Sequence, residues 1–255
     1  MFLRADGDSF SIMPKSASRE ASGNGEVLGL MRAIVRGDGV EAARLLGTSP
    51  GLAREPLAAG ATRAGAADFF FEEIRHYLYA GDTPLHAAAV GYRRDTAELL
   101  IELGADVAAR NRRGAQPLHY AADGGPGVRA EAQAETIAFL IEKGAGPDAL
   151  DKSGVAPLHR AVRQRSAVAV DALLRNGADV RLKNKNGSTP LHLAVQNTGK
   201  SGSGSPEAKA AQREIIELLL KAGANLDDRD ANGKTARQCV QSDWVFALFP
   251  PAGKS

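Results

Sequence analysis

Four of the five histidines recur in one short motif, and imidazole is the side chain that most readily binds a metal or moves a proton near neutral pH. Each follows a proline and a leucine, and successive copies are 33, 40 and 33 residues apart. Such a period places them in successive structural units, which we expect to lie one helix layer, ~8–10 Å, apart. Two of them then cannot share a zinc ion, whose bonds to nitrogen are only ~2.0–2.1 Å long. The spacing therefore predicts a repeating frame and not a metal centre; the four copies are His86, His119, His159 and His192.

Two further patterns could carry chemistry, but neither has the neighbours that its chemistry needs. The run Gly-Lys-Ser at 199–201 ends like a phosphate-binding loop, yet Ala194 stands where that loop requires its first glycine, and no strand is expected before it. Cys239, the only cysteine, has no histidine near it in the sequence to activate it as a nucleophile. The sequence therefore predicts a protein that is not an enzyme and has no catalytic residues, cofactor or metal.

The composition restricts the cellular location that we expect for the protein and the types of side chain that can form its core. One cysteine allows no internal disulfide, which favours a reducing, cytoplasmic location. No apolar run reaches the ~20 residues that a membrane-spanning helix needs, so we expect no membrane contact. Hydrophobic residues make up 44% of the chain but aromatic residues only 5%, so the core must consist largely of small and aliphatic side chains. Such side chains let helices approach closely and favour stacked helix pairs.

The charge is unevenly distributed, although the net charge is only +2. Residues 1–109 hold 11 basic and 15 acidic side chains, a balance of −4, whereas residues 110–200 hold 14 and 8, a balance of +6. Residues 201–255 hold 7 of each. The excess of positive charge therefore lies in the middle units of the chain.

The elements that position the histidines can be read from one unit, residues 79–111. After a turn, Thr83 predicts a helix N-cap, because its hydroxyl can accept a hydrogen bond from an otherwise unpaired N–H. Pro84 suits the first helical position, where no N–H is needed. A second apolar stretch predicts a helix over about 95–103, which Gly104 ends. The unit is thus a turn, a short capped helix and a second helix stopped by glycine.

The same order returns three more times, and a partial copy follows from Asn232. Over residues 79–235 this pattern resembles the ankyrin repeat. The resemblance implies an all-α dominated solenoid, in which stacked helix-turn-helix repeats carry turns that project as β-hairpin fingers, with helical caps at both ends. It also implies that the motif histidines hydrogen-bond backbone atoms and join adjacent turns. The residues of the repeat motif are Thr83, Pro84, His86, Pro117, His119, Pro157, His159, Thr189, Pro190 and His192.

The rest of the chain divides around these repeats. Ser, Gly and charged residues predict a disordered tail over 1–24, and two apolar helical patterns after it predict a degenerate cap. The aromatic stretch 66–79 predicts an additional helix, packed where the first finger would be, with His76 on its face. Insertions of 7 and 13 residues, near 124–129 and 198–206, lengthen the second and fourth repeats between their two helices. The predicted segments are the tail (1–24), the cap with the aromatic helix (25–78), four repeats (79–111, 112–151, 152–184 and 185–230) and a partial capping repeat with its tail (231–255).

The ankyrin resemblance also indicates binding residues, because contacts in this family come from finger tips and from the ends of the first helices, which line a concave groove. Three adjacent fingers of this chain are basic at those positions, although exposed lysines and arginines are also ordinary on any surface. We expect a non-enzymatic, monomeric scaffold for an acidic or phosphate-bearing protein partner. The predicted binding residues are Arg110, Arg112, Arg113, Lys152, Ser153, Lys183, Lys185 and Asn186 from the fingers, with Asp123, Arg163, Gln164, Gln196 and Asn197 from the first helices.

Two other functions are open to the same chain. Nucleic acid could bind the basic strip, with an affinity that falls steeply as salt rises. Only Tyr120 lies near the strip as an aromatic residue, so we expect a protein partner and not a nucleic acid. An enzyme built on the unmatched segment 69–79 is the third possibility, although nothing in that segment has catalytic spacing.

Overall fold

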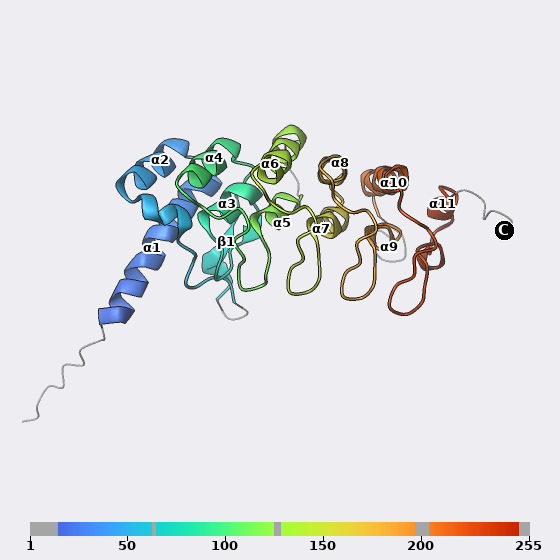
Figure 1. Ribbon diagram of the computed structural model, residues 1–255, viewed down its shortest axis with the longest axis horizontal. Helices are drawn as coiled ribbons and strands as arrows, with labels where there is room; N and C mark the ends of the chain where they lie inside the picture. The colour runs from blue at the N-terminus through green and yellow to red at the C-terminus, as the bar shows by residue number, and fades with distance from the viewer. Residues whose placement is uncertain (1–14, 63–64, 125–128, 197–203, 250–255) are drawn as a thin grey trace, which may run out of the picture.

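The computed structural model describes residues 15–62, 65–124, 129–196 and 204–249, which form an elongated stack of helix pairs (Figure 1). In each repeat a first helix lies in one layer and a second helix lies in another. The loops between repeats, the fingers, extend to the same side of the stack. This arrangement confirms the predicted helical solenoid. The first helices are α3 (Pro84–Val90), α5 (Pro117–Ala121), α7 (Pro157–Gln164) and α9 (Pro190–Ala194); the second helices are α4 (Arg94–Glu102), α6 (Ala130–Glu142), α8 (Ala167–Arg175) and α10 (Pro206–Lys221).

We call the side formed by the fingers and the first helices the inner face, and the side formed by the second helices the outer face (Figure 1). The loops that precede the second, third and fourth repeats, fingers 2–4, are closed by turn hydrogen bonds and not by strands. Among fingers 2–5, in the part of the chain that the structure describes, only finger 5 contains an antiparallel bridge, between Arg229 and Thr235. The fingers are thus tighter loops than the predicted β-hairpins. Each is numbered by the repeat that it precedes: finger 1 is 55–83, finger 2 is 105–116, finger 3 is 145–156, finger 4 is 178–189 and finger 5 is 224–236.

The first helices begin at the prolines of the repeat motif, each after a residue with extended backbone. Before α3, the N–H of Thr83 donates to Nδ1 of His86 at 3.1 Å, and the Thr83 hydroxyl lies 3.0 Å from the same atom. The histidine therefore shares in a cap that the sequence suggests for the threonine alone. Ala87 and Ala88 follow with no exposed surface, and such small side chains let the stacked layers approach closely.

The two repeats with insertions have shorter first helices and longer second helices. The first helices α5 and α9 span 5 residues each, against 7 in α3 and 8 in α7. The extra length of α6 and α10 carries a glutamine back to the end of the first helix. Gln133 Nε2 donates to the carbonyl of Ala121 at 3.0 Å, and Gln212 Nε2 donates to that of Ala194 at 2.7 Å. Both bonds pair carbonyls that a helix end otherwise leaves unsatisfied. Parts of both predicted insertion loops lie outside the described residues.

The N-terminal cap is a pair of helices, as the apolar pattern predicts. Leu30, Met31 and Ile34 of the first of them are buried, and this helix packs against α3. Asp38 caps the second, since its Oδ1 accepts the N–H of Glu41 at 2.9 Å. A short 3-10 helix then leads into finger 1. These elements are α1 (Lys15–Arg36), α2 (Gly39–Thr48) and η1 (Pro50–Arg54).

The predicted disordered tail over 1–24 is wrong for its last part, because α1 begins at Lys15. Serine and glycine have low helix propensity, which is why the sequence of this stretch predicts a disordered tail. A packed helix extends more easily than an isolated one forms, and the C-terminal half of α1 is held by the first repeat. Residues 1–14 lie outside the described residues.

The aromatic stretch 66–79 is a β-hairpin, so the predicted additional helix is wrong. After the 3-10 helix η2 (Ala67–Phe69), strand β1 (Phe70–Phe71) pairs antiparallel with β2 (His76–Tyr77). Phe70 lies opposite Tyr77 with ring centroids 4.8 Å apart. Aromatic residues favour strands, where such cross-strand pairs stabilise the sheet. We call residues 66–79 the hairpin.

The hairpin is an insertion into finger 1, which agrees with its predicted place. At its base the Leu57 N–H donates to the Asp82 carbonyl, and the Gly81 N–H donates to the Leu57 carbonyl, both at 2.8 Å. Gly60 permits this closure, because a Cβ there would lie 2.3 Å from the backbone nitrogen of Ala80. The chain thus leaves the finger, forms the hairpin and returns to the same base.

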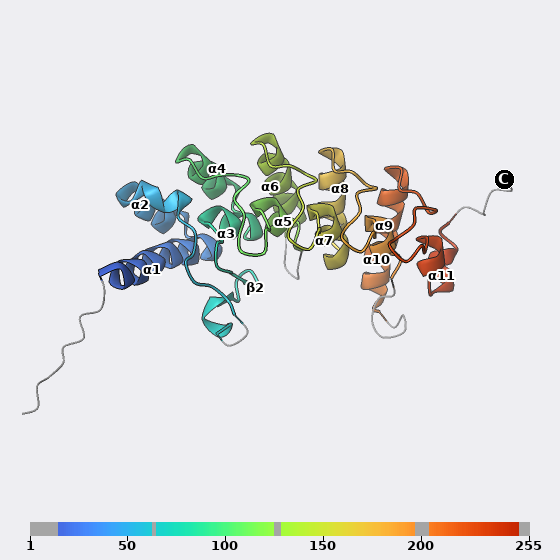
Figure 2. The same ribbon diagram turned by 60° about the horizontal axis from the view of Figure 1, so that its bottom comes forward.

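The C-terminal cap closes the stack at the end opposite α1 (Figure 2). It consists of η4 (Arg237–Cys239) and α11 (Asp243–Phe246), and it buries Val245 and Phe249. Gln238 takes the place of the motif histidine, and its Oε1 accepts the N–H of Thr235 at 3.0 Å. Gln238 therefore keeps the cap bond that the motif histidines make at their own N-caps.

Candidate protein-interaction surface

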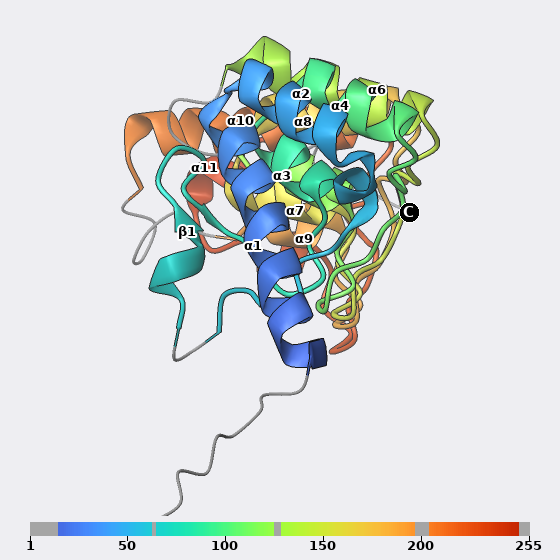
Figure 3. The ribbon, with the colours of Figure 1, turned by 90° about the vertical axis from the view of Figure 1, so that its left-hand side faces the viewer.

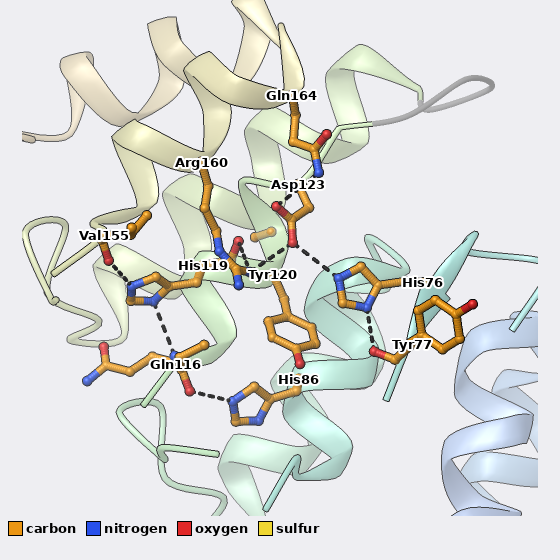
Figure 4. Close-up of polar contacts among 12 residues, drawn as sticks. His76, Tyr77, His86, Gln116, His119, Tyr120, Asp123, Val155, Arg160 and Gln164 are labelled. Atoms are coloured by element: carbon orange, nitrogen blue, oxygen red, sulfur yellow. Dashed lines mark hydrogen bonds and ion pairs between the residues drawn. The ribbon is translucent and has the colours of Figure 1, made fainter. Parts of the chain in front are cut away.

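The motif histidines join each repeat to the next finger. His119 Nδ1 accepts the N–H of Gln116 at 3.1 Å, and Nε2 lies 3.0 Å from the carbonyl of Val155 in finger 3 (Figure 4). A carbonyl can only accept, so Nε2 carries the proton and the ring is neutral. Equivalent bonds reach from His86, His159 and His192 to the carbonyls of Ala115, Ser188 and Lys234, each at 3.1 Å.

Burial lowers the pKa of three of these imidazoles and favours their neutral form. Desolvation lowers the pKa of His86 and of His159, and it lowers the pKa of His119 to about 4. With both ring nitrogens bonded to backbone groups, the motif histidines have no lone pair left for a metal ion. Within the described ranges no group of three or more His, Cys, Asp or Glu side chains could hold one. These residues are therefore the frame of the stack, as the resemblance implies.

Each of fingers 2–5 is fixed by one side-chain oxygen at the start of its tip turn, a role that the sequence analysis did not assign. In finger 2, Asn111 Oδ1 accepts the N–H groups of Arg113 at 2.9 Å and Ala115 at 3.0 Å. Gly114 closes the turn with a φ of +76°, which favours glycine. The tip residues between these points are held in set positions. The same pair of bonds is made by Asp151, Asn184 and Asp230.

Basic side chains connect neighbouring fingers by donating to backbone carbonyls. Arg110 Nη1 lies 3.0 Å from its own finger's Gly114 carbonyl and 2.7 Å from the carbonyl of Leu150 in finger 3. Lys183 Nζ donates across to the carbonyl of Arg229 in finger 5 at 2.9 Å. These bonds hold the cations in a row along the fingers.

The charge on this row is not cancelled. A carbonyl positions a cation but leaves its full charge, and Lys185 Nζ likewise donates to the carbonyl of Lys152. In the described part of the chain, none of the predicted basic binding residues forms an ion pair with Asp or Glu. Arg181 differs, because it pairs with Asp228 in finger 5 at 2.6 Å. Uncompensated positive charge therefore lies on fingers 2–4.

Two of the predicted binding residues are already engaged by the insertion in finger 1. The guanidinium groups of Arg112 and Arg113 lie over the ring of Tyr79, 5.4 and 5.0 Å from its centroid. Arg112 Nη2 also donates to the carbonyl of Ala61 at 2.6 Å. At finger 2 the two exposed arginines of the basic row are thus already in contact with an aromatic ring.

Asp123, predicted to contact a partner, is instead a buried anchor that is 8% exposed (Figure 4). Its Oδ2 lies 2.8 Å from Arg160 Nη1 and 3.2 Å from His76 Nε2, and Gln164 Nε2 lies 3.5 Å from its Oδ1. The placement of His76 on a helix face is wrong, because this residue belongs to β2 and contacts Asp123.

The sequence analysis also missed Arg160. It donates to the His119 carbonyl at 3.3 Å as well as to Asp123, and it lies 5.5 Å from the ring centroid of Tyr120. Tyr120 is only 1% exposed, and its hydroxyl donates to Asp82 at 2.8 Å. A signal was present, since the residue after the motif histidine is uncharged in the other repeats.

The remaining predicted residues are exposed on the inner face. Arg163 and Gln196 also line a small pocket of about 120 Å³ between α7 and α9. Asn197 lies outside the described residues. The exposed set is Lys152, Ser153, Arg163, Gln164, Lys183, Lys185, Asn186 and Gln196.

A larger pocket of about 520 Å³ lies beside the hairpin, the segment on which an enzyme could be built. Carboxylates line it, but Glu73 pairs with Arg36 at 3.4 Å and Asp123 pairs with Arg160. No serine, threonine, cysteine or lysine is among its described lining residues. None of the helices in the described ranges is both long and apolar enough to cross a membrane.

The stacked helix pairs, ordered fingers and histidine bonds define a repeat solenoid with one continuous inner face. Family comparison agrees with this class: residues 80–112 match the model of the ankyrin repeat, and residues 128–230 match the model for ankyrin repeats in three copies. Together the matches cover just over half of the chain, which therefore belongs to the ankyrin repeat family. Such repeats form protein–protein interaction modules that are generally non-enzymatic. None of the curated proteins compared with the chain matches it.

Proposed function

We propose that the protein binds an acidic or phosphate-bearing segment of another protein through the inner face of repeats 2–4, centred on fingers 3 and 4. The observation that carries the proposal is the row of cations that carbonyl groups position and that, among the described residues, form no ion pair with Asp or Glu. A partner's carboxylate or phosphate can approach such a row without first breaking an internal ion pair. Complementary charge of this kind speeds association and selects the partner.

Lys152, Arg163 and Lys185 are the residues on which the proposal depends most. All three are exposed, and they lie on finger 3, the end of α7 and finger 4. Arg112 and Arg113 contribute charge, but their guanidinium groups already contact Tyr79. We therefore place the strongest contacts beyond finger 2.

The structure supports nucleic acid as a partner less well. Binding of single strands commonly uses exposed aromatic rings on which bases stack. Tyr120 is buried beside His76 and Arg160, and Tyr79 lies beneath two arginines. A gel-shift assay at low salt is the test, and we expect no retarded species.

A peptide-display selection on the full chain tests the proposed function. Selected peptides should be enriched in Asp, Glu or phosphoserine, and their affinity should fall as salt rises. The triple variant Lys152→Glu, Arg163→Glu, Lys185→Glu should bind them at least about tenfold more weakly, because each change replaces attraction by repulsion.

The matched control is Lys143→Glu, Arg175→Glu, Lys221→Glu, which changes the net charge equally at exposed residues associated with the second helices. We expect this control to bind like the unaltered protein. Equal losses of peptide affinity in both triple variants would show that only the net charge of the protein matters. Selection of peptides without acidic residues would contradict the proposal.

A further inference from the structure

His76 differs from the four motif histidines in what its ring nitrogens face. Nε2 lies 3.2 Å from the Asp123 carboxylate, and Nδ1 lies 2.6 Å from the carbonyl of Tyr77 (Figure 4). Both partners can only accept, so both nitrogens must carry a proton for the two bonds to form. Arg160 Nη1 lies 2.8 Å from the same Asp123 oxygen and places a second cation beside it. The geometry around His76 therefore requires an imidazolium.

This cation fastens the hairpin over part of the inner face. Seen along the stack, the hairpin and the fingers lie on opposite sides below the first helices (Figure 3). The His76 ring lies 4.7 Å from the ring of Tyr120 on α5, and Asp123 follows that helix. Tyr79, at the other end of the hairpin, contacts Arg112 and Arg113 in finger 2. The hairpin thus occupies the repeat 1–2 end of the face.

The hairpin is held firmly at its base, and Phe71 of β1 adds a buried apolar contact nearer its tip. The backbone bonds between Leu57 and the 81–82 segment close the base, and Leu78 is buried. At the tip, Glu73 pairs with Arg36 at 3.4 Å with both side chains largely exposed. Exposed pairs of this kind contribute little. Ile74 also packs against the core, and the contact between His76 and Asp123 is therefore the main polar attachment of the tip.

Several charged or titratable groups surround His76. From the repeats these are His86 on α3, Tyr120 and Asp123 at α5, and Arg160 on α7. Tyr92, Arg93 and Arg129 line the adjoining pocket. The hairpin itself adds Glu72, Glu73, Arg75 and Tyr77.

We propose that the hairpin is a pH-dependent latch, closed when His76 is protonated and released at its tip when His76 is neutral. Loss of either proton makes a ring lone pair face an oxygen lone pair, which turns one attractive contact into a repulsive one. Release uncovers Tyr120, Asp123 and Arg160 and lengthens the accessible inner face. The latch stands on these contacts alone, whereas its effect on a partner rests on the proposed function.

Hydrogen–deuterium exchange of the full chain without any partner tests the latch. Rates are corrected for their intrinsic pH dependence, and segment 66–79 is followed between about pH 5.5 and pH 7.5, where histidines titrate. We expect exchange in this segment to rise about tenfold with pH, as a charge-assisted hydrogen bond is lost.

Two substitutions of His76 distinguish the effect of its charge from the effect of changing its side chain. His76→Gln is never charged and should exchange fast at both pH values, whereas His76→Arg is always charged and should stay protected at both. Protection of 66–79 that is independent of pH in the unaltered protein, or an unchanged pH response in His76→Gln, would overturn the latch. If the latch holds but acidic peptides bind equally at both pH values, only its link to partner binding fails.

Discussion

The two hydrogen bonds of His119 can be removed one at a time, which gives a direct measure of how the frame is held. His119→Gln should keep the bond to the Gln116 N–H, as Gln238 does in the terminal repeat with the Thr235 N–H at 3.0 Å. It should lose the bond to the Val155 carbonyl, which a shorter side chain does not reach. His119→Leu removes both bonds and leaves an apolar side chain in the same place.

The sizes of the two effects follow from what each change leaves unpaired. The Val155 carbonyl still accepts the N–H of Asp151 at 3.0 Å, so the glutamine variant loses only one net hydrogen bond. We expect the free energy of unfolding to fall by ~1 kcal/mol. The leucine variant also buries the Gln116 N–H without an acceptor, which adds ~1–3 kcal/mol. Leucine should therefore be clearly worse than glutamine near neutral pH.

The pH dependence gives the comparison a second, independent signature. Burial lowers the pKa of His119 to about 4, while an imidazole in the unfolded chain titrates near ~6.5. The unfolded state therefore binds the proton first, so this stability is complete above pH ~6.5 and is lost as pH falls toward 4. The loss amounts to roughly 3 kcal/mol. His119→Gln escapes it, so this variant should become the more stable protein below about pH 6.

Urea unfolding followed by circular dichroism, at several pH values between about 4.5 and 7.5, measures both signatures. The other histidines titrate in both proteins and cancel in the difference. Equal destabilisation by glutamine and leucine would show that the cap bond is unimportant. A difference between the unaltered protein and His119→Gln that does not change with pH would refute the buried, neutral histidine.

Other expected outcomes concern the base of the hairpin and the two glutamines. Gly60→Ala should lower the thermal midpoint and expose the hairpin to proteolysis, because the new Cβ would meet the Ala80 backbone at 2.3 Å; Gly65→Ala, whose nearest contact would be 3.6 Å away, is the control that should have little effect. In urea unfolding, Gln133→Leu should lower the free energy of unfolding by ~1 kcal/mol more than Gln212→Leu does. The reason is that Gln133 Oε1 accepts a hydrogen bond from Ser166 at 2.7 Å, whereas Gln212 Oε1 has no described partner. Equal effects of the two glutamine changes would contradict this reading of the insertions.

The frame could be predicted from the sequence because its determinants are local. Thr83, Pro84 and His86 lie within one helical turn and recur at a fixed period, so the repeating frame follows from their spacing, while the role of the histidine came from the family resemblance. The glycine that ends each second helix is equally local, and so is the apolar pattern of α1 and α2. Each of these signals acts over a few residues.

The hairpin and the anchor around Asp123 could not be predicted in the same way. Strands of two residues show no periodicity, and the hairpin is held by partners far along the chain, with His76 and Asp123 47 residues apart. From their positions in the repeats, Asp123 and Arg163 are both predicted to be exposed binding residues, yet only Arg163 is exposed. Whether a charged side chain meets a carbonyl, a carboxylate or water is decided by the fold.

The central claim is that the uncompensated cations of fingers 3 and 4 bind an acidic segment. The most direct measurement is a titration of the isotope-labelled full chain with an acidic peptide from the display selection, followed by amide chemical shifts. The account predicts that the shifts concentrate at Lys152, Arg163 and Lys185 and disappear at high salt. Shifts concentrated on the outer helices α6, α8 and α10, or a response that salt does not weaken, would contradict it.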